Sequence, residues 1–140
     1  MIDLAALRTT LSAALAPVPV QGAIEFAAIA ASGLARAPLV WLVPLDERGD
    51  TNVLNSGVHQ QITVTLGVVY AVRDVRDAQG MNAADSLSAL RQSVFTALLN
   101  HFPTGATEPI SYVSGGLLDF QNAILFWQDQ FQTRYTLRAV

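Results

Sequence analysis

The chain has 140 residues, of which 51% are apolar and 14% are charged, and its formal net charge is −3. This length fits a single domain, residues 1–140, with enough apolar side chains for a real core. The lack of cysteine excludes disulfides and thiolate metal sites, no apolar run approaches the roughly 20 residues of a membrane span, and an acidic chain without lysine has no visible basic patch for DNA.

The first predicted element is a helix near the N-terminus. Asp3 can cap it, because its carboxylate can accept a hydrogen bond from a free backbone N–H of a helix that begins near Leu4. Pro17 and Pro19 end this helix. Its apolar face is made by four leucines at helical spacing, Leu4, Leu7, Leu11 and Leu15.

The next stretch is less regular. Residues 20–25 are ambiguous, and the alanine-rich residues 26–31 predict a short helix or turn. Residues 39–43 are apolar and β-prone, which predicts a buried strand that Pro44 closes. Residues 46–56 then predict a polar loop, which is long enough to bind a partner and too short to link two domains.

The most regular pattern in the chain spans residues 58–72. The even-numbered residues from 58 to 72 are apolar except Gln60, and His59, Gln61, Thr63, Thr65 and Gly67 alternate with them, which predicts a long strand with one buried and one wetted face. At roughly 3.3 Å per residue the strand would extend about 50 Å, whereas the radius of gyration expected for the chain is about 14 Å. The strand therefore either bends, with Gly67 as the candidate position, or projects toward a neighbour.

A second long helix is predicted over residues 83–100, and Arg91 falls near the middle of its apolar face. A charge in that position must reach solvent along its stem or meet a carboxylate. We expect a salt bridge within the subunit. The alternative is an ion pair with a neighbouring subunit, and a catalytic arginine is disfavoured.

Two more strands complete the pattern, at residues 110–120 and 123–138. The element order and the short connections predict an α+β fold, with a single mixed, mostly antiparallel β-sheet, two main helices packed on it and long strands extending toward neighbours. The charged fraction is well below the roughly 25% of a typical domain. This favours an obligate oligomer, and the alternative is a monomer with a large core.

The chain has no residue pattern that predicts catalysis. His59 and His101 have no metal-ligand partner at a known spacing, and the acidic residues of 46–50 do not match a calcium loop. The aromatic residues and arginine within 126–135 superficially resemble a platform for single-stranded nucleic acid, but core or interface packing explains them more simply. Carboxylates for a hydrolase site are candidates only by elimination: Glu25, Asp119 and Asp129. We therefore expect no enzyme activity, no cofactor, no metal, no specific nucleic acid and no membrane partner.

From Pro38 onward the chain resembles the tail terminator proteins of long-tailed bacteriophages. Residues 1–37 match only loosely, and the matching motifs are structural in character. The resemblance covers about two thirds of the chain and rests on PLVWLVPLDER at 38–48, the long strand followed by AVRDVRD at 71–77, LRQSVFTALL at 90–99, and SGGLLDF with ILFWQDQF within 114–131.

This resemblance implies a structural virion protein. Such proteins form a ring, usually a hexamer, on the last ring of the tail tube, end tube polymerisation and join the tail to a head-side connector protein. They use no cofactor and perform no reaction. The implied partners are copies of the chain itself, the tail tube protein and the connector, and the implied location is the head-proximal end of the tail, in a virion assembled in the host bacterial cytoplasm.

Two other interpretations stay open. One is another neck or tail-completion protein of the same particle, and the other is a small α+β domain that binds a ligand or peptide. We predict subunit contacts on the long strand and on Trp127, Phe131 and Arg134, and axial contacts in the loops at 46–56 and 73–82. The predicted interface residues are Asp46, Glu47, Arg48, Asp50, Asn52, Asn55, Arg73, Arg76, Arg91, Trp127, Phe131 and Arg134.

Overall fold

The structure is a computed structural model, and it describes residues 1–32, 37–73, 81–121 and 124–139. Three helices and five strands lie in this part of the chain. None of these helices is long and apolar enough to cross a membrane. In chain order the elements are α1 (Leu4–Leu15), β1 (Val20–Gln21), α2 (Ala23–Ser32), β2 (Leu39–Gly49), β3 (Val58–Arg73), α3 (Met81–Leu98), β4 (Ser111–Gln121) and β5 (Ile124–Ala139).

The strands form one sheet in the order β1-β2-β3-β5-β4. β1 is parallel to β2, and the other three pairings are antiparallel. The predicted α+β fold with a mixed, mostly antiparallel sheet is therefore confirmed. The two longest strands are central: β3 and β5 pair without a register shift from Val58 opposite Ala139 to Arg73 opposite Ile124.

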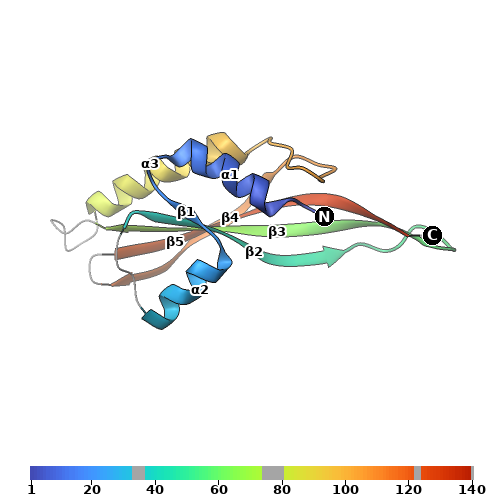
Figure 1. The fold of residues 1–140 in the computed structure, drawn as a ribbon, viewed down its shortest axis with the longest axis horizontal. Helices are drawn as coiled ribbons and strands as arrows, with labels where there is room; N and C mark the ends of the chain where they lie inside the picture. The colour runs from blue at the N-terminus through green and yellow to red at the C-terminus, as the bar shows by residue number, and fades with distance from the viewer. Residues whose placement is uncertain (33–36, 74–80, 122–123, 140) are drawn as a thin grey trace.

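Helices cover both faces of the sheet, but only over part of its length (Figure 1). α1 and α3 lie on one face, over the larger core, which takes Val40 and Leu42 of β2, the even-numbered residues 62–72 of β3, and Phe131 and Tyr135 of β5. α2 lies on the other face, over a smaller core that includes Trp41, Val69 and Ile124. Two main helices were expected on the sheet, and the third, α2, is the longer form of the predicted short helix.

The predicted long strand is confirmed as β3, and its pairing with β5 is continuous over its whole length. Gly67 does not bend the strand back, because the ladder to β5 continues through it. A Cβ atom at this position would lie 3.0–3.1 Å from side-chain atoms of Leu45 and Val43. The glycine therefore leaves room for two side chains of β2 to lie against the centre of β3.

The prediction that Pro44 closes its strand is wrong. β2 continues through Pro44 to Gly49, and its register with β3 shifts between Pro44 and Asp46, which marks a bulge at Leu45. Proline is tolerated on edge strands and at bulges, and Pro44 lies beside a bulge, past the point where β1 stops pairing with β2. The predicted loop at 46–56 is consequently strand up to Gly49.

The start of the chain follows the sequence prediction more closely. Asp3 caps α1, since its Oδ1 accepts a hydrogen bond from the Ala6 N–H at 3.1 Å. The ambiguous segment at 20–25 divides into β1 and the first turn of α2. Glu25 accepts a hydrogen bond from the Gly22 N–H three residues earlier, at 3.1 Å, which is half of a capping box and explains why the helix begins before residue 26.

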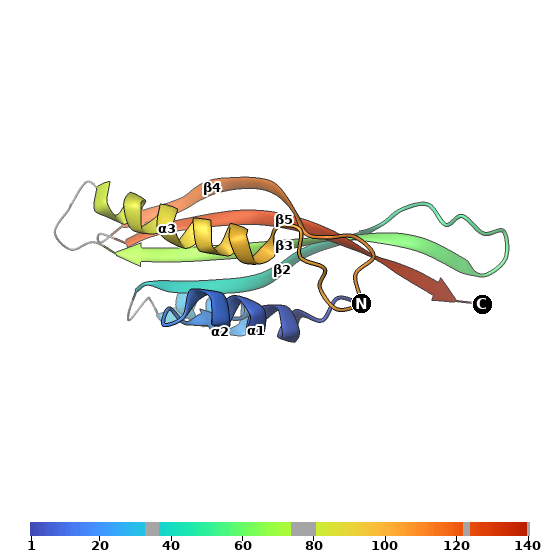
Figure 2. The same ribbon diagram turned by 90° about the horizontal axis from the view of Figure 1, so that it is seen from above.

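Past the helices the sheet continues as an arm, which we define as residues 46–65 and 132–139. Both views show the β2–β3 hairpin projecting well beyond α1 and α3, with the end of β5 beside it (Figures 1 and 2). At the end of the arm the chain turns between β2 and β3 through residues 50–57, which we call the tip loop. The long strands thus add length to the molecule instead of folding back on its core.

The buried centre of β3 supports the first prediction. Leu66 is fully buried, whereas Leu137 on the arm is 42% exposed. Replacing Leu66 with alanine leaves a cavity and should lower the free energy of unfolding by about 3 kcal/mol. Leu137→Ala is the matched control and should cost less than about 1 kcal/mol. Denaturant titration measures both values, and similar losses for the two variants would contradict the described core.

Candidate assembly surfaces

A buried carboxylate holds α3 to the sheet. Asp129 of β5 has no exposed surface, and its two side-chain oxygens accept four hydrogen bonds. The Tyr70 hydroxyl donates at 3.0 Å, the Trp127 indole at 2.9 Å, and Arg91 donates from Nε at 2.9 Å and from an Nη at 3.0 Å. The two-point contact with Arg91 is the strongest geometry open to such a pair.

The arginine in this cluster settles one sequence prediction. Arg91 forms the expected salt bridge within its own subunit. Its guanidinium also lies 5.1 Å from the ring centre of Phe95 and 4.9 Å from that of Trp127, close enough for cation–π attraction. The hydrogen bond to Asp129 raises the pKa of Arg91, so the arginine stays charged.

The buried Asp129 carboxylate also affects the ionisation of Tyr70. Burial, followed by the negative charge of Asp129, raises the pKa of the Tyr70 hydroxyl. Both carboxylate oxygens of Asp129 are occupied by donors, so the group has no lone pair directed at an open cavity. This arrangement locks a helix onto a sheet, and it offers no acid or base to a substrate.

Gly115 of β4 makes the cluster possible. A Cβ atom there would collide with Asp129 Oδ1 and would lie 2.6 Å from the Tyr112 hydroxyl and 3.2 Å from the Trp127 indole nitrogen. The next residue, Gly116, has nothing within 4 Å of such an atom. The glycine pair thus has two different roles, and the close approach of β4 to the buried cluster requires only the first.

Asp129 had a signal in the sequence that went unused. It shares the apolar face of β5 with Trp127 and Phe131, so it breaks that face in the same way that Arg91 breaks the apolar face of α3. Two opposite charges on two otherwise apolar faces predict each other as partners. Asp129 was considered only as a leftover carboxylate.

One of the two long strands lies partly at a free edge of the sheet. β3 has β2 and β5 as neighbours and is internal, whereas β4 pairs with β5 only from Ile124 to Gln132. The open edges among the described strands therefore belong to β4, to the part of β2 that β1 does not reach, and to the end of β5 past Gln132. β4 also exposes large apolar side chains, which are Tyr112, Val113, Leu117 and Leu118.

The predicted interface residues on the final strand are mostly engaged within their own chain. Phe131 is fully buried between β5 and α3, where its ring packs edge-on against Phe95. Trp127 is half-buried and belongs to the Asp129 cluster. Arg134 is half-buried with Glu108 at 3.8 Å, and its Nε is buried without a hydrogen-bond partner. Contacts with a neighbour would have to use the surface around these residues.

The other predicted residues lie at the two ends of β3. Asp46, Glu47 and Arg48 are exposed on the arm, although on a strand instead of in a loop. Arg73 is exposed at the opposite end of β3. Arg76 and most of the predicted loop at 73–82 lie outside the described residues. The structure therefore does not bring the predicted set together on one surface.

The tip loop is held by one asparagine. The Asn52 side chain donates to the carbonyl oxygens of Leu54 and Gly57 at 3.2 and 2.9 Å, and it accepts from the N–H groups of Leu54 and His59 at 3.4 and 2.8 Å. Asp50 and Asn55 are exposed beside it. Asn52 was predicted to contact a partner, but its amide is used to fix the loop.

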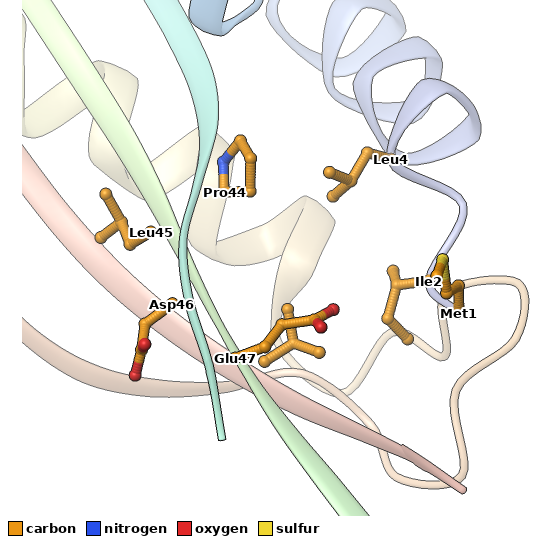
Figure 3. Close-up of a pocket in the computed structure, with 8 residues that line it drawn as sticks. Met1, Ile2, Leu4, Pro44, Leu45, Asp46 and Glu47 are labelled. Carbon is orange, nitrogen blue, oxygen red and sulfur yellow. The ribbon is translucent and has the colours of Figure 1, made fainter. Parts of the chain in front are cut away.

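A groove lies where the arm meets the N-terminal segment, with a volume of about 330 Å³. In Figure 3 the side chains of Pro44 and Glu47 point from β2 toward Leu4 and Ile2, whereas Leu45 and Asp46 point to the other side of the strand. The Tyr135 hydroxyl donates to the Glu47 carboxylate over long distances, 3.4 Å to Oε1 and 3.3 Å to Oε2. The residues around the groove are Met1, Ile2, Leu4, Pro44, Leu45, Asp46, Glu47 and Val64.

Comparison with known protein families identifies the family of the chain. A family model described as phage tail terminator protein matches residues 1–139. The comparison with curated proteins found no match. The family match extends over the N-terminal residues as well, which the sequence resemblance covered only loosely, and the resemblance is thereby confirmed.

The glycine pair on β4 gives a matched test of the Asp129 cluster. Gly115→Ala forces a methyl group into the cluster and should lower the free energy of unfolding by about 2 kcal/mol or more. Gly116→Ala has open space and should change it by less than about 0.5 kcal/mol. Thermal or denaturant unfolding compares the two. Equal stability of the two variants would mean that the cluster is not packed as described.

Tyr70 makes stability depend on alkaline pH. Its pKa is raised by folding, so the unfolded chain loses the phenolic proton first, near pH 10, and stability present below that pH is lost as the pH rises. We expect unfolding free energy to fall above about pH 10 by up to about 1.4 kcal/mol per pH unit from this residue.

The control for this pH effect is Tyr70→Phe. This variant should be less stable at neutral pH, because Asp129 loses one donor, but its stability should fall less steeply above pH 10. The chain has no lysine, but burial and then the nearby Glu47 carboxylate also raise the pKa of Tyr135, so part of the alkaline slope should remain in Tyr70→Phe. An unchanged slope in Tyr70→Phe would rule out Tyr70 as the source.

Proposed function

The chain belongs to the phage tail terminator family, and from this premise we propose that it caps the tail tube as a hexameric ring, ends tube polymerisation and joins the tail to the head-side connector. Family membership makes it a structural, non-enzymatic tail component, and so a part of the virion. The proposal goes beyond family membership in three respects: the hexameric ring, the capping of the tube and the connection to the head.

The arm is the observation that supports this proposal most directly. The sheet extends past its helices (Figure 2). The outer residues of the arm, such as Arg48, Leu137 and Arg138, are exposed, whereas Ile62 and Tyr135 nearer its base are buried in the larger core. β3 pairs with β5 along all 16 of its residues, so the arm is a rigid extension of the sheet and not a loose hairpin. Such an element suits a protein whose task is to reach and hold neighbouring subunits.

Two of the open sheet edges, those of β4 and of the outer part of β2, support closure into a ring. A closed ring of identical subunits uses a heterologous interface, in which one patch on each subunit meets a different patch on the next. The β4 edge is apolar at Val113, Leu117 and Leu118, whereas the outer part of β2 is charged. The two edges differ from each other, as a head-to-tail contact requires, and free edges readily pair with a further strand.

Axial contacts are proposed for the charged and polar residues of the arm and its tip loop. Asp46, Arg48, Asp50 and Asn55 are exposed there, and a rim of this kind suits recognition of a partner more than tight packing. Arg73 is the corresponding candidate at the other end of β3. One end of the subunit would then meet the tube and the other the connector.

The experiment that tests the proposal is assembly of tail tubes from tube subunits with and without the purified chain. Added chain should shorten the tubes in proportion to its concentration, and a ring should cap one end in electron micrographs. Mixing capped tails with filled heads should then restore infectivity. Tubes of unchanged length, with no density at either end, would rule out the proposed cap.

A deletion of residues 50–55 separates folding from joining. The deletion removes the tip loop and leaves the core, so circular dichroism should match the intact chain while tail-to-head joining is lost. Joining at normal efficiency would exclude the loop. Replacing Trp127 with a charged residue is a poorer test, because Trp127 donates to buried Asp129 and its loss would destabilise the subunit itself.

A further inference from the structure

Two large apolar side chains at the end of the arm are exposed to solvent. Val53 is 73% exposed and Leu54 is 45% exposed, although they lie in an otherwise polar loop. The loop presents them in a fixed way, because Asn52 ties it on both sides and the Val53 N–H donates to the His59 carbonyl at 3.1 Å. An ordered loop with outward apolar side chains is typical of an anchor that inserts into a partner.

The groove at the base of the arm has the complementary character. Most of its lining is aliphatic, from Ile2, Leu4, Pro44 and Val64, and its volume of about 330 Å³ exceeds the roughly 150 Å³ of an apolar cavity that holds benzene. It can therefore take two branched aliphatic side chains. Figure 3 shows it open between the first residues of the chain and β2.

The tip loop cannot fill the groove of its own chain. Both features lie on the same arm, and β3 pairs with β5 from one end to the other and with β2 from Ala71 to Ile62. Bringing the tip back to the groove would break these ladders. Any apolar segment that fills the groove must come from another molecule.

Charge also favours the tip of another copy. The end of the arm carries Arg138 in register with His59, with Asp50 as the nearby carboxylate. The groove presents the Glu47 carboxylate and has no basic side chain in its lining. A tip that enters the groove can place a cation near Glu47, whose present hydrogen bond from Tyr135 is long.

We propose that the Val53–Leu54 tip of one copy inserts into the groove at the base of the arm of the next copy, between β2 and the N-terminal segment. This inference rests on the proposed ring and names one of its contacts. Repeated one-way contacts of this kind generate a ring when the rotation closes, whereas a reciprocal pair, with each tip in the other copy's groove, closes as a two-fold dimer. Light scattering of the intact chain separates the two, and association that stops at the dimer would overturn the contact as part of a ring.

Cross-linking tests the contact directly, because the chain has no cysteine of its own. One full-length chain carries Leu54→Cys and a second carries Glu47→Cys, and the two are mixed and treated with a short bismaleimide. We expect a cross-linked dimer of the two chains, at a yield at least about ten-fold above a control in which the second chain carries Ile24→Cys, an exposed position on α2.

Three results would overturn the contact. They are a yield no higher than that of the Ile24→Cys control, an efficient link between two Leu54→Cys chains, which would mean a symmetric tip-to-tip contact, and a link within one chain that carries both cysteines. Each of these can occur while the intact chain still caps tubes, so failure of this contact is distinguishable from failure of the proposed function.

A second measurement does not depend on cross-linking. Leu54→Asp places a charge in an apolar groove and should weaken association of the intact chain about ten-fold or more by light scattering. Ile24→Asp introduces the same charge on α2 and should leave association unchanged. Equal association of both variants would also overturn the contact, and circular dichroism verifies that both are folded.

Discussion

The antiparallel pairing of β3 with β5 is the constraint on which the rest of the molecule depends. It runs from Val58 opposite Ala139 to Arg73 opposite Ile124 without a register shift. At one end these strands carry the two cores and the helices, and at the other end they form the arm. Because side chains alternate across a strand, this single register also decides which residues meet α3, which meet α2, and which stay in solvent on the arm.

The Asp129 cluster completes the covered half of the sheet. A buried carboxylate is costly unless its hydrogen-bonding capacity is filled, and here Arg91, Tyr70 and Trp127 fill it from three elements. Such a cluster favours one docking of α3 over alternatives that would leave a charge unpaired. The cluster therefore fixes the position of α3 on the sheet. Gly115 leaves the space that lets β4 lie beside the cluster.

The uncovered half of the sheet has the opposite character. In this half only β3 has a neighbouring strand on both sides, and the end displays a loop fixed by Asn52 with exposed apolar side chains. Because the arm is rigid and the tip loop is ordered, less conformational entropy is lost when a partner binds. A subunit with a packed core at one end and an arm that can contact neighbouring molecules at the other fits a family of tail components.

The sequence by itself determined the local features of this protein. The period-two patterns at 58–72 and 123–138, the Asp3 cap and the unmatched Arg91 all predicted what the structure contains, since each depends on near neighbours or on one face. Tertiary structure decided the rest. It carried β2 through Pro44, paired the two-residue β1, buried Phe131, made β3 an internal strand and brought residues 1–4 beside the arm, because strand order and long-range packing leave no periodic trace in the chain.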